Sequence, residues 1–120
     1  MRKIKTENPQ LISLIRYLKR AAREGNAKIW SKIARDLSRP RNRRTSVNLS
    51  HINRCTKAGQ TIAVPGKVLG AGILHHPVTI TAFTFSTAAR RKIIKSKGKC
   101  LTFAELIKKN PKGSNIMIVG

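Results

Sequence analysis

The stretch VTITAFTF, residues 78–85, is the segment that predicts the fold class. Its β-branched and aromatic residues are typical of a strand. The alternation of apolar side chains changes phase at Ala82–Phe83, which indicates burial on both faces of a sheet or a bulge. Ser86 or Thr87 then caps a helix over about residues 88–97. The stretch therefore predicts a buried strand that leads directly into a helix.

The same order of elements recurs in the second part of the chain. Three times a short helix meets a turn with lysine and glycine, and then a brief strand. The turns contain Gly59, Gly98 and Gly113, and the strands TIAV, CLT and NIMIV follow them. The recurrence has no fixed period, so it is no sequence repeat. It favours stacked strand–helix units in an α/β layer over a helical bundle.

Two helices are predicted ahead of this α/β part. Asn8 caps the first, Pro9 occupies its first turn, and Gly25 ends it. The second runs from about residue 27 to residue 37. Trp30 lies on its apolar stripe, which favours a place in the core over stacking on a base.

At 120 residues the chain is expected to form one domain, and 40% of its residues are apolar, enough for a modest core. We divide it into a basic arm (residues 1–7), a helical N-terminal part (8–38), an Arg-rich connection (39–47) and an α/β part (48–120). The arm shows no helix or strand pattern. No apolar run approaches the roughly 20 residues of a membrane span.

Net charge is the main indication of function. Lys and Arg number 26 against four acids, which gives a formal charge of +22 and a pI near 11.7. Solubility alone needs a net charge of only about 2 to 8. The excess implies a polyanionic partner, and nucleic acid fits better than an anionic membrane surface.

The acidic residues argue against an enzyme. Glu7, Glu24 and Asp36 are scattered, and no two carboxylates form an evident acid/base pair. Glu105 has a structural role, because Thr102 and Glu105 form a capping box at the start of a helix. We expect neither catalysis nor a cofactor.

Three further patterns predict no site or targeting signal. His51 and Cys55 stand four residues apart on a predicted helix, but Cys55 and Cys100 show no zinc spacing, which favours reduced thiols without a metal. The glycines of VPGKVLGAGIL match neither nucleotide-binding pattern, so turns or a bulge are expected there. The Arg-rich amphipathic N-terminus resembles a transit peptide only superficially, since serine enrichment is absent.

The stretch SRPRNRRTSVN, residues 38–48, holds all four arginines of the connection. Three interpretations fit this stretch: a solvated loop, a nuclear localisation signal or a binding element. A guanidinium holds a phosphate with two hydrogen bonds and also stacks on bases, which favours binding. No zinc-finger, leucine-zipper or RNP pattern is present, so recognition of structured RNA through its backbone is the better expectation. A DNA-compacting chromosomal protein remains the alternative.

Six segments together resemble one family. They are NPQLISLIRYLKRAA, IWSKIARDLSRPR, VNLSHINR, VPGKVLGAGIL, the FS after the long strand, and NPKGSNIMIV. The chain is similar to the large-subunit ribosomal protein family eighteen-e of archaea and eukaryotes, related to bacterial-type large-subunit protein fifteen. Because the chain ends straight after its last strand, it looks like the compact archaeal form.

The resemblance implies an irregular superhelix of strand–strand–helix units with the two N-terminal helices packed on it. It also implies a cytoplasmic, ribosomal protein that binds large-subunit ribosomal RNA beside neighbouring ribosomal proteins, without catalysis. By position, RPRNRR resembles an RNA-contacting loop, PGKVLG a turn that brings Lys67 to the backbone, and KGSN a turn that contacts phosphates or only closes. The expected RNA-binding residues are Arg2, Lys3, Lys5, Arg39, Arg41, Asn42, Arg43, Arg44, Lys67, Arg90, Arg91, Lys112, Ser114 and Asn115.

Overall fold

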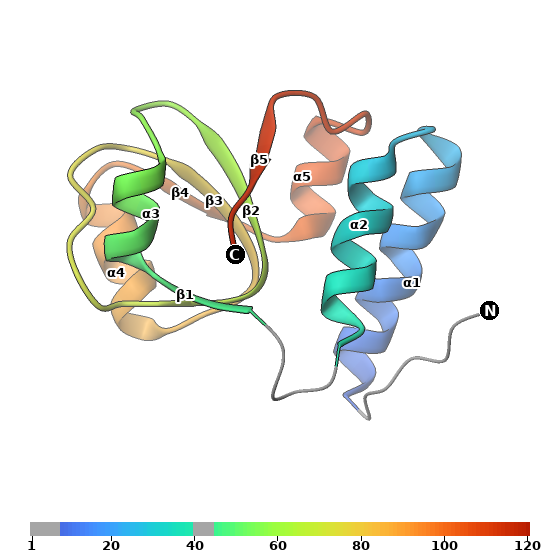
Figure 1. Cartoon of the computed structure of the whole chain (residues 1–120), viewed down its shortest axis with the longest axis horizontal. Helices are drawn as coiled ribbons and strands as arrows, with labels where there is room; N and C mark the ends of the chain where they lie inside the picture. Colours follow the sequence, from blue (N-terminus) through green and yellow to red (C-terminus); the bar gives the residue numbers. More distant parts are fainter. Residues whose placement is uncertain (1–7, 40–44) are drawn as a thin grey trace.

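The computed structural model describes residues 8–39 and 45–120, and within them five helices surround one parallel sheet (Figure 1). The α/β class and the two N-terminal helices are therefore confirmed. The elements are α1 Pro9–Glu24, α2 Lys28–Leu37, β1 Thr45–Asn48, α3 Leu49–Cys55, β2 Thr61–Leu69, β3 Thr79–Phe85, α4 Thr87–Lys95, β4 Lys99–Leu101, α5 Phe103–Lys109 and β5 Ile116–Ile118.

The N-terminal helices begin and end where local chemistry places them. The Asn8 side chain accepts hydrogen bonds from the N–H groups of Gln10 (3.0 Å) and Leu11 (3.4 Å), which satisfies two donors at the start of α1. Trp30 on α2 is fully buried, and its indole N–H donates to the Pro111 carbonyl at 2.8 Å. The expected core role of Trp30 is confirmed.

The sheet is parallel throughout, with β2 in its centre. β3 and then β4 follow on one edge of β2. Two strands share the other edge: β5 pairs with the start of β2 at residues 61–63, and β1 pairs with its end at residues 66–69. The end of the chain, Gly120, therefore lies next to Thr45, the first residue of β1 (Figure 1).

A bulge separates these two pairings. The register between β2 and β3 shifts between Val64 and Lys67, where Pro65 has no N–H to give to the sheet. On β3, Ile80 and Ala82 face one apolar cluster while Phe83 packs against the other. The phase change in residues 78–85 thus reflects a strand covered on both faces, beside a bulge in its neighbour.

Each face of the sheet has its own apolar core. On one face α1, α2 and α5 pack over Ala63 and Leu101. On the other, α3 and α4 pack over Ile62 and Ile80. Figure 1 shows the two groups of helices on opposite sides of the strands. This three-layer arrangement leaves the strand ends and the outer helix faces to solvent.

Two predictions about the connection and the turn after it were wrong. Residues 45–47, predicted as connection, belong to β1, and PGKVL is part of β2, so Lys67 lies on a strand and not in a turn. The physical reason is Gly66. A Cβ there would lie 2.0 Å from the Thr45 carbonyl oxygen, so only glycine lets β1 approach closely enough to pair. The bulge, the other structure expected in this glycine segment, is present between Val64 and Lys67.

Smaller differences concern element ends. The helix predicted over 88–97 is α4, Thr87–Lys95; Lys97 has φ +66° and cannot continue it. The last strand starts one residue later than expected because Asn115 has φ +59°. The capping box of Thr102 and Glu105 is present as predicted.

Candidate nucleic-acid interface

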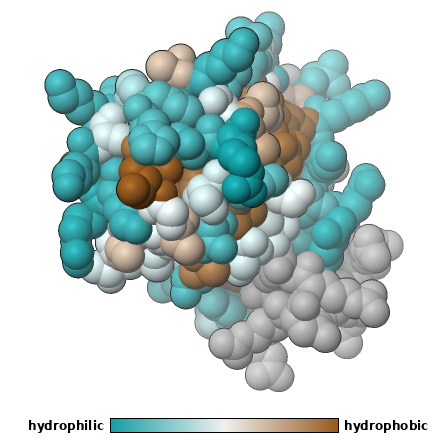
Figure 2. All heavy atoms as spheres, turned by 60° about the vertical axis from the view of Figure 1, so that its left-hand side comes forward, coloured by the Kyte–Doolittle hydropathy of each residue, from teal (hydrophilic) through white to brown (hydrophobic). Residues whose placement is uncertain are grey.

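Exposed cations dominate the surface of the described residues. The three carboxylates described there are Glu24, Asp36 and Glu105, and the one ion pair recorded in this part joins Arg39 to Asp36 at 3.2 Å. Figure 2 shows hydrophilic residues over most of the visible face, with apolar residues only in small separate areas. The positive charge is therefore largely uncompensated within the fold.

Lys67 stands in a row of polar side chains across three strands. Its sheet partners are Ser46 on β1 and Thr84 on β3, and all three residues are exposed. Residues paired in register point to the same side of a parallel sheet. The row thus presents an ammonium flanked by two hydroxyls, one of them on β1.

A hollow of about 370 Å³ lies beside β1 and the start of α3. Ser46, Asn48, Ser50, His51 and Arg54 contribute polar side chains to it. Sequence reasoning missed Arg54 as a candidate. Its signal was the i, i+4 spacing of Ser50 and Arg54, which places both on one side of α3, beside β1.

Arg39 is exposed at the end of α2 and holds Asp36. It marks one end of the Arg-rich connection, and Thr45 marks the other. The remaining predicted residues of the connection and of the N-terminal arm lie outside the described residues: Arg2, Lys3, Lys5, Arg41, Asn42, Arg43 and Arg44.

Arg90 and Arg91 are exposed on α4, away from Lys67's face of the sheet. The Arg90 guanidinium lies 5.1 Å from the centre of the Phe85 ring, in a cation–π contact. Lys92 on the same helix has a structural role, since its ammonium donates to the carbonyls of Gly70 (2.7 Å) and Gly72 (2.9 Å). Arg90 and Lys92 therefore both contact other parts of the fold.

The KGSN turn is held firmly from two sides. The Asn110 amide donates to the Ser114 carbonyl (2.7 Å), while the Ser114 N–H donates to the Asn110 amide oxygen (3.2 Å). The Trp30 bond to Pro111 fixes the residues just ahead. The backbone thus closes the turn, while the side chains of Lys112, Ser114 and Asn115 stay exposed.

The predicted residues do not form one cluster. Lys67 lies in the second half of β2, whereas the KGSN turn precedes β5, which pairs with the first residues of β2. Six residues of extended strand separate Thr61 from Lys67, roughly 20 Å. Together with α4, the candidates occupy three separate places on the fold.

The thiols and imidazoles form no metal centre among the described residues, where no group of three or more His, Cys, Asp or Glu side chains could hold an ion. The Cys55 sulfur lies 3.6 Å from Nε2 of His51, a pairwise contact. Burial raises the pKa of the Cys100 thiol. No helix among the described residues is long and apolar enough to cross a membrane.

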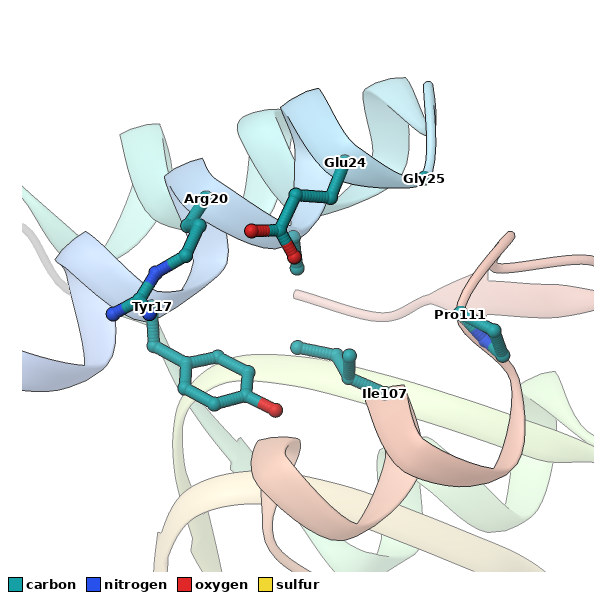
Figure 3. A pocket seen from close by; sticks show the side chains of 7 residues that line it. Tyr17, Arg20, Glu24, Gly25, Ile107 and Pro111 are labelled. Atoms are coloured by element: carbon teal, nitrogen blue, oxygen red, sulfur yellow. The ribbon is translucent and has the colours of Figure 1, made fainter.

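A second hollow, of about 290 Å³, lies between α1 and α5 and is shown in Figure 3. Tyr17, Arg20 and Glu24 line it from α1, opposite Ile107 and Pro111. The Glu24 carboxylate repels a phosphate and offsets the charge of the Arg20 guanidinium, so the lining carries no net positive charge. This hollow is therefore chemically unlike the cationic surfaces around Lys67.

Comparison with known proteins assigns the family. The model of the family described as "Ribosomal protein 60S L18 and 50S L18e" matches residues 1–120. Large ribosomal subunit protein eL18 of Methanoregula boonei is 48% identical over 118 residues, 98% of each chain. The protein of the same name from Methanothermobacter thermautotrophicus is 45% identical over 119 residues, covering 99% of this chain and 98% of its own. The chain belongs to the ribosomal protein family of 60S L18 and 50S L18e.

Proposed function

We propose that this protein is a structural constituent of the large ribosomal subunit that binds large-subunit ribosomal RNA through its phosphate backbone. Residues 1–120 act as a single RNA-binding domain on the cytoplasmic ribosome, beside neighbouring ribosomal proteins. The family and the names of the relatives support the subunit. The net charge of +22 supports the RNA.

The observation that carries the RNA contact is the exposed row of Ser46, Lys67 and Thr84. The ammonium neutralises one phosphate, and the hydroxyls donate to phosphate or ribose oxygens beside it. The hollow lined by His51 and Arg54 extends this surface along β1. The arginines of the connection, which enters β1 at Thr45, add bidentate phosphate contacts.

Binding of this kind releases counterions and needs no catalytic group. Each phosphate neutralised contributes about −0.7 to −0.9 to the slope of log K against log [salt]. Two of the three described carboxylates have structural partners, since Asp36 pairs with Arg39 and Glu105 caps α5. We therefore propose a role in stabilising RNA structure and assign no reaction to the protein.

The alternative, a DNA-compacting protein, shares the charge and differs in the partner. The test is competition binding of the full chain to a large-subunit ribosomal RNA fragment and to duplex DNA of equal length at physiological salt. We expect tighter binding to the RNA, because A-form backbone and 2′-hydroxyls are what a hydroxyl-rich surface contacts. Equal affinity for the RNA fragment and the duplex DNA would contradict the ribosomal hypothesis.

The contribution of the connection is tested with Arg41→Ala, Arg43→Ala and Arg44→Ala combined. We expect weaker RNA binding and a salt slope flatter by about two to three units, one per lost contact. The matched control removes Arg16, Arg23 and Arg35, exposed arginines of α1 and α2. Equal losses in both variants would mean diffuse charge and no preferred site at the connection.

A further inference from the structure

A small polar pocket of about 260 Å³ lies at the amino-terminal edge of the sheet. Thr61, Thr79 and Lys99, the first residues of β2, β3 and β4, pair in register and form a row there. They point to the face that α5 covers, since Ala63 and Leu101, two residues on, face the cluster of α1, α2 and α5. Leu106, Lys109, Asn110, Ser114 and Asn115 complete the lining.

The floor of this pocket is apolar and its wall is polar. Leu101 and Leu106 are only 8% and 3% exposed. Above them, the hydroxyls of Thr61 and Thr79 and the Asn115 amide make no hydrogen bond to any described residue. The pocket therefore offers several free donors and acceptors around a small apolar surface, a combination that suits a planar heterocycle.

The turn before β5 is fixed in the shape that forms one wall. Asn110 brackets Ser114 with two hydrogen bonds, and Asn115 adopts φ +59°. A Cβ on Gly113 would lie 2.2 Å from a methyl carbon of Ile29, so glycine is required where the turn meets α2. Because the wall is already held in place, a ligand would lose little affinity to ordering it.

Lys99 and Lys109 are exposed at the rim and form no ion pair within 4.0 Å among the described residues. Glu105, one turn before Lys109, is engaged by the Thr102 N–H and hydroxyl. The carboxyl end of α5 also borders the pocket, and its carbonyls disfavour an anion deep inside. An anionic group therefore belongs at the rim, on the two ammonium groups.

We propose that this pocket holds one unstacked nucleotide of the ribosomal RNA, with its base on Leu101 and Leu106 and its phosphate on Lys99 and Lys109. The proposal rests on the proposed function and adds a second RNA contact, roughly 20 Å along β2 from Lys67. At about 260 Å³ the space is below the roughly 300–1,000 Å³ of free small-molecule sites, which suits one base of a longer chain. Two separate contacts let the protein hold two RNA segments together.

The principal variant is Thr61→Val with Thr79→Val, which removes two hydroxyls and keeps charge, shape and strand preference. We expect binding of the full chain to large-subunit ribosomal RNA to weaken about tenfold, with the salt slope unchanged, since no phosphate contact is lost. Ser13→Ala with Ser31→Ala removes two exposed hydroxyls from α1 and α2 and is expected to change neither quantity.

A second pair keeps the test valid if the valine variant melts at a lower temperature. Lys99→Gln with Lys109→Gln is compared with Lys28→Gln with Lys32→Gln, two exposed lysines of α2. Both pairs remove two charges. A larger loss of RNA affinity at the pocket pair supports the proposal, and equal losses overturn it.

Base-specific chemical probing of the RNA distinguishes RNA binding from a purely structural role of the two threonines. A structural role alone would not change the reactivity of one particular base. We expect one unpaired base, protected by the wild-type protein from reagents that attack the Watson–Crick edge, to become reactive with the valine variant. Unchanged affinity and an unchanged pattern in a variant that folds normally would overturn the pocket alone. A wild-type protein that binds duplex DNA as tightly as RNA would instead overturn the proposed function.

Discussion

Lys92 has a structural role, unlike the many lysines whose side chains are simply exposed. It donates to the Gly70 carbonyl at 2.7 Å and to the Gly72 carbonyl at 2.9 Å, and so ties the loop after β2 to α4. The informative substitution is Lys92→Met, which removes the ammonium and keeps most of the apolar stem. Lys95→Met, on the same helix and exposed, removes the same charge and serves as the control.

A hydrogen bond from a charged donor contributes about 1.5–3 kcal/mol to stability. Here two bonds share one ammonium, and the bond to Gly72 is exposed, so water replaces part of it. We expect the free energy of unfolding of Lys92→Met to be about 2 kcal/mol lower than that of Lys95→Met. This corresponds to a Tm lower by roughly 8 °C. Both substitutions remove one positive charge and so reduce the repulsion among the remaining cations equally. This effect cancels when the two variants are compared.

The measurement is urea unfolding of both variants followed by circular dichroism, with RNA affinity determined in parallel. Lys92→Met should lose stability and no more RNA affinity than the control. Coincident unfolding curves would refute the structural role of Lys92. A loss of RNA affinity well beyond that of Lys95→Met would place Lys92 in the interface.

Three further substitutions test the fold. Thr81→Val should raise the free energy of unfolding by about 1 kcal/mol, because the buried Thr81 hydroxyl has no hydrogen-bond partner; a less stable variant would contradict this. Gly66→Ala should cost about 3 kcal/mol or more and speed hydrogen exchange in β1, whereas unchanged exchange would refute the close approach to Thr45. Hydrogen bonds from Thr102 lower the pKa of Glu105, so its contribution is present above the unfolded pKa and lost as pH falls through the folded one. Glu105→Gln should therefore be less stable than wild type at neutral pH and equal to it in strong acid, and a constant difference across pH would oppose this.

The parts of the fold that local chemistry determines were predictable from the sequence. Asn8 caps α1 and Thr102 caps α5 as expected, since both signals involve residues within one turn. Trp30 was expected in the core from helical spacing alone, and it is buried. Its bond to the Pro111 carbonyl joins residues 81 positions apart, which no local pattern encodes.

Pairings between distant segments could not be predicted in this way. The sequence of residues 45–47 indicates part of a basic connection. These residues form a strand because Gly66 leaves room for Thr45. The pocket at the edge of the sheet gathers Thr61, Thr79 and Lys99 from three strands, residues that stand about twenty positions apart along the chain. Only the sheet register brings them into one row.

The role in the large subunit is tested most directly by sedimentation of cell lysate through a density gradient. The protein is followed in lysates with intact large subunits and in lysates from which the subunits have been dissociated. We predict that it sediments with intact large subunits and leaves that position when they are dissociated. A protein that sediments with chromosomal DNA, or that stays at the top of the gradient while large subunits are intact, would contradict the ribosomal assignment.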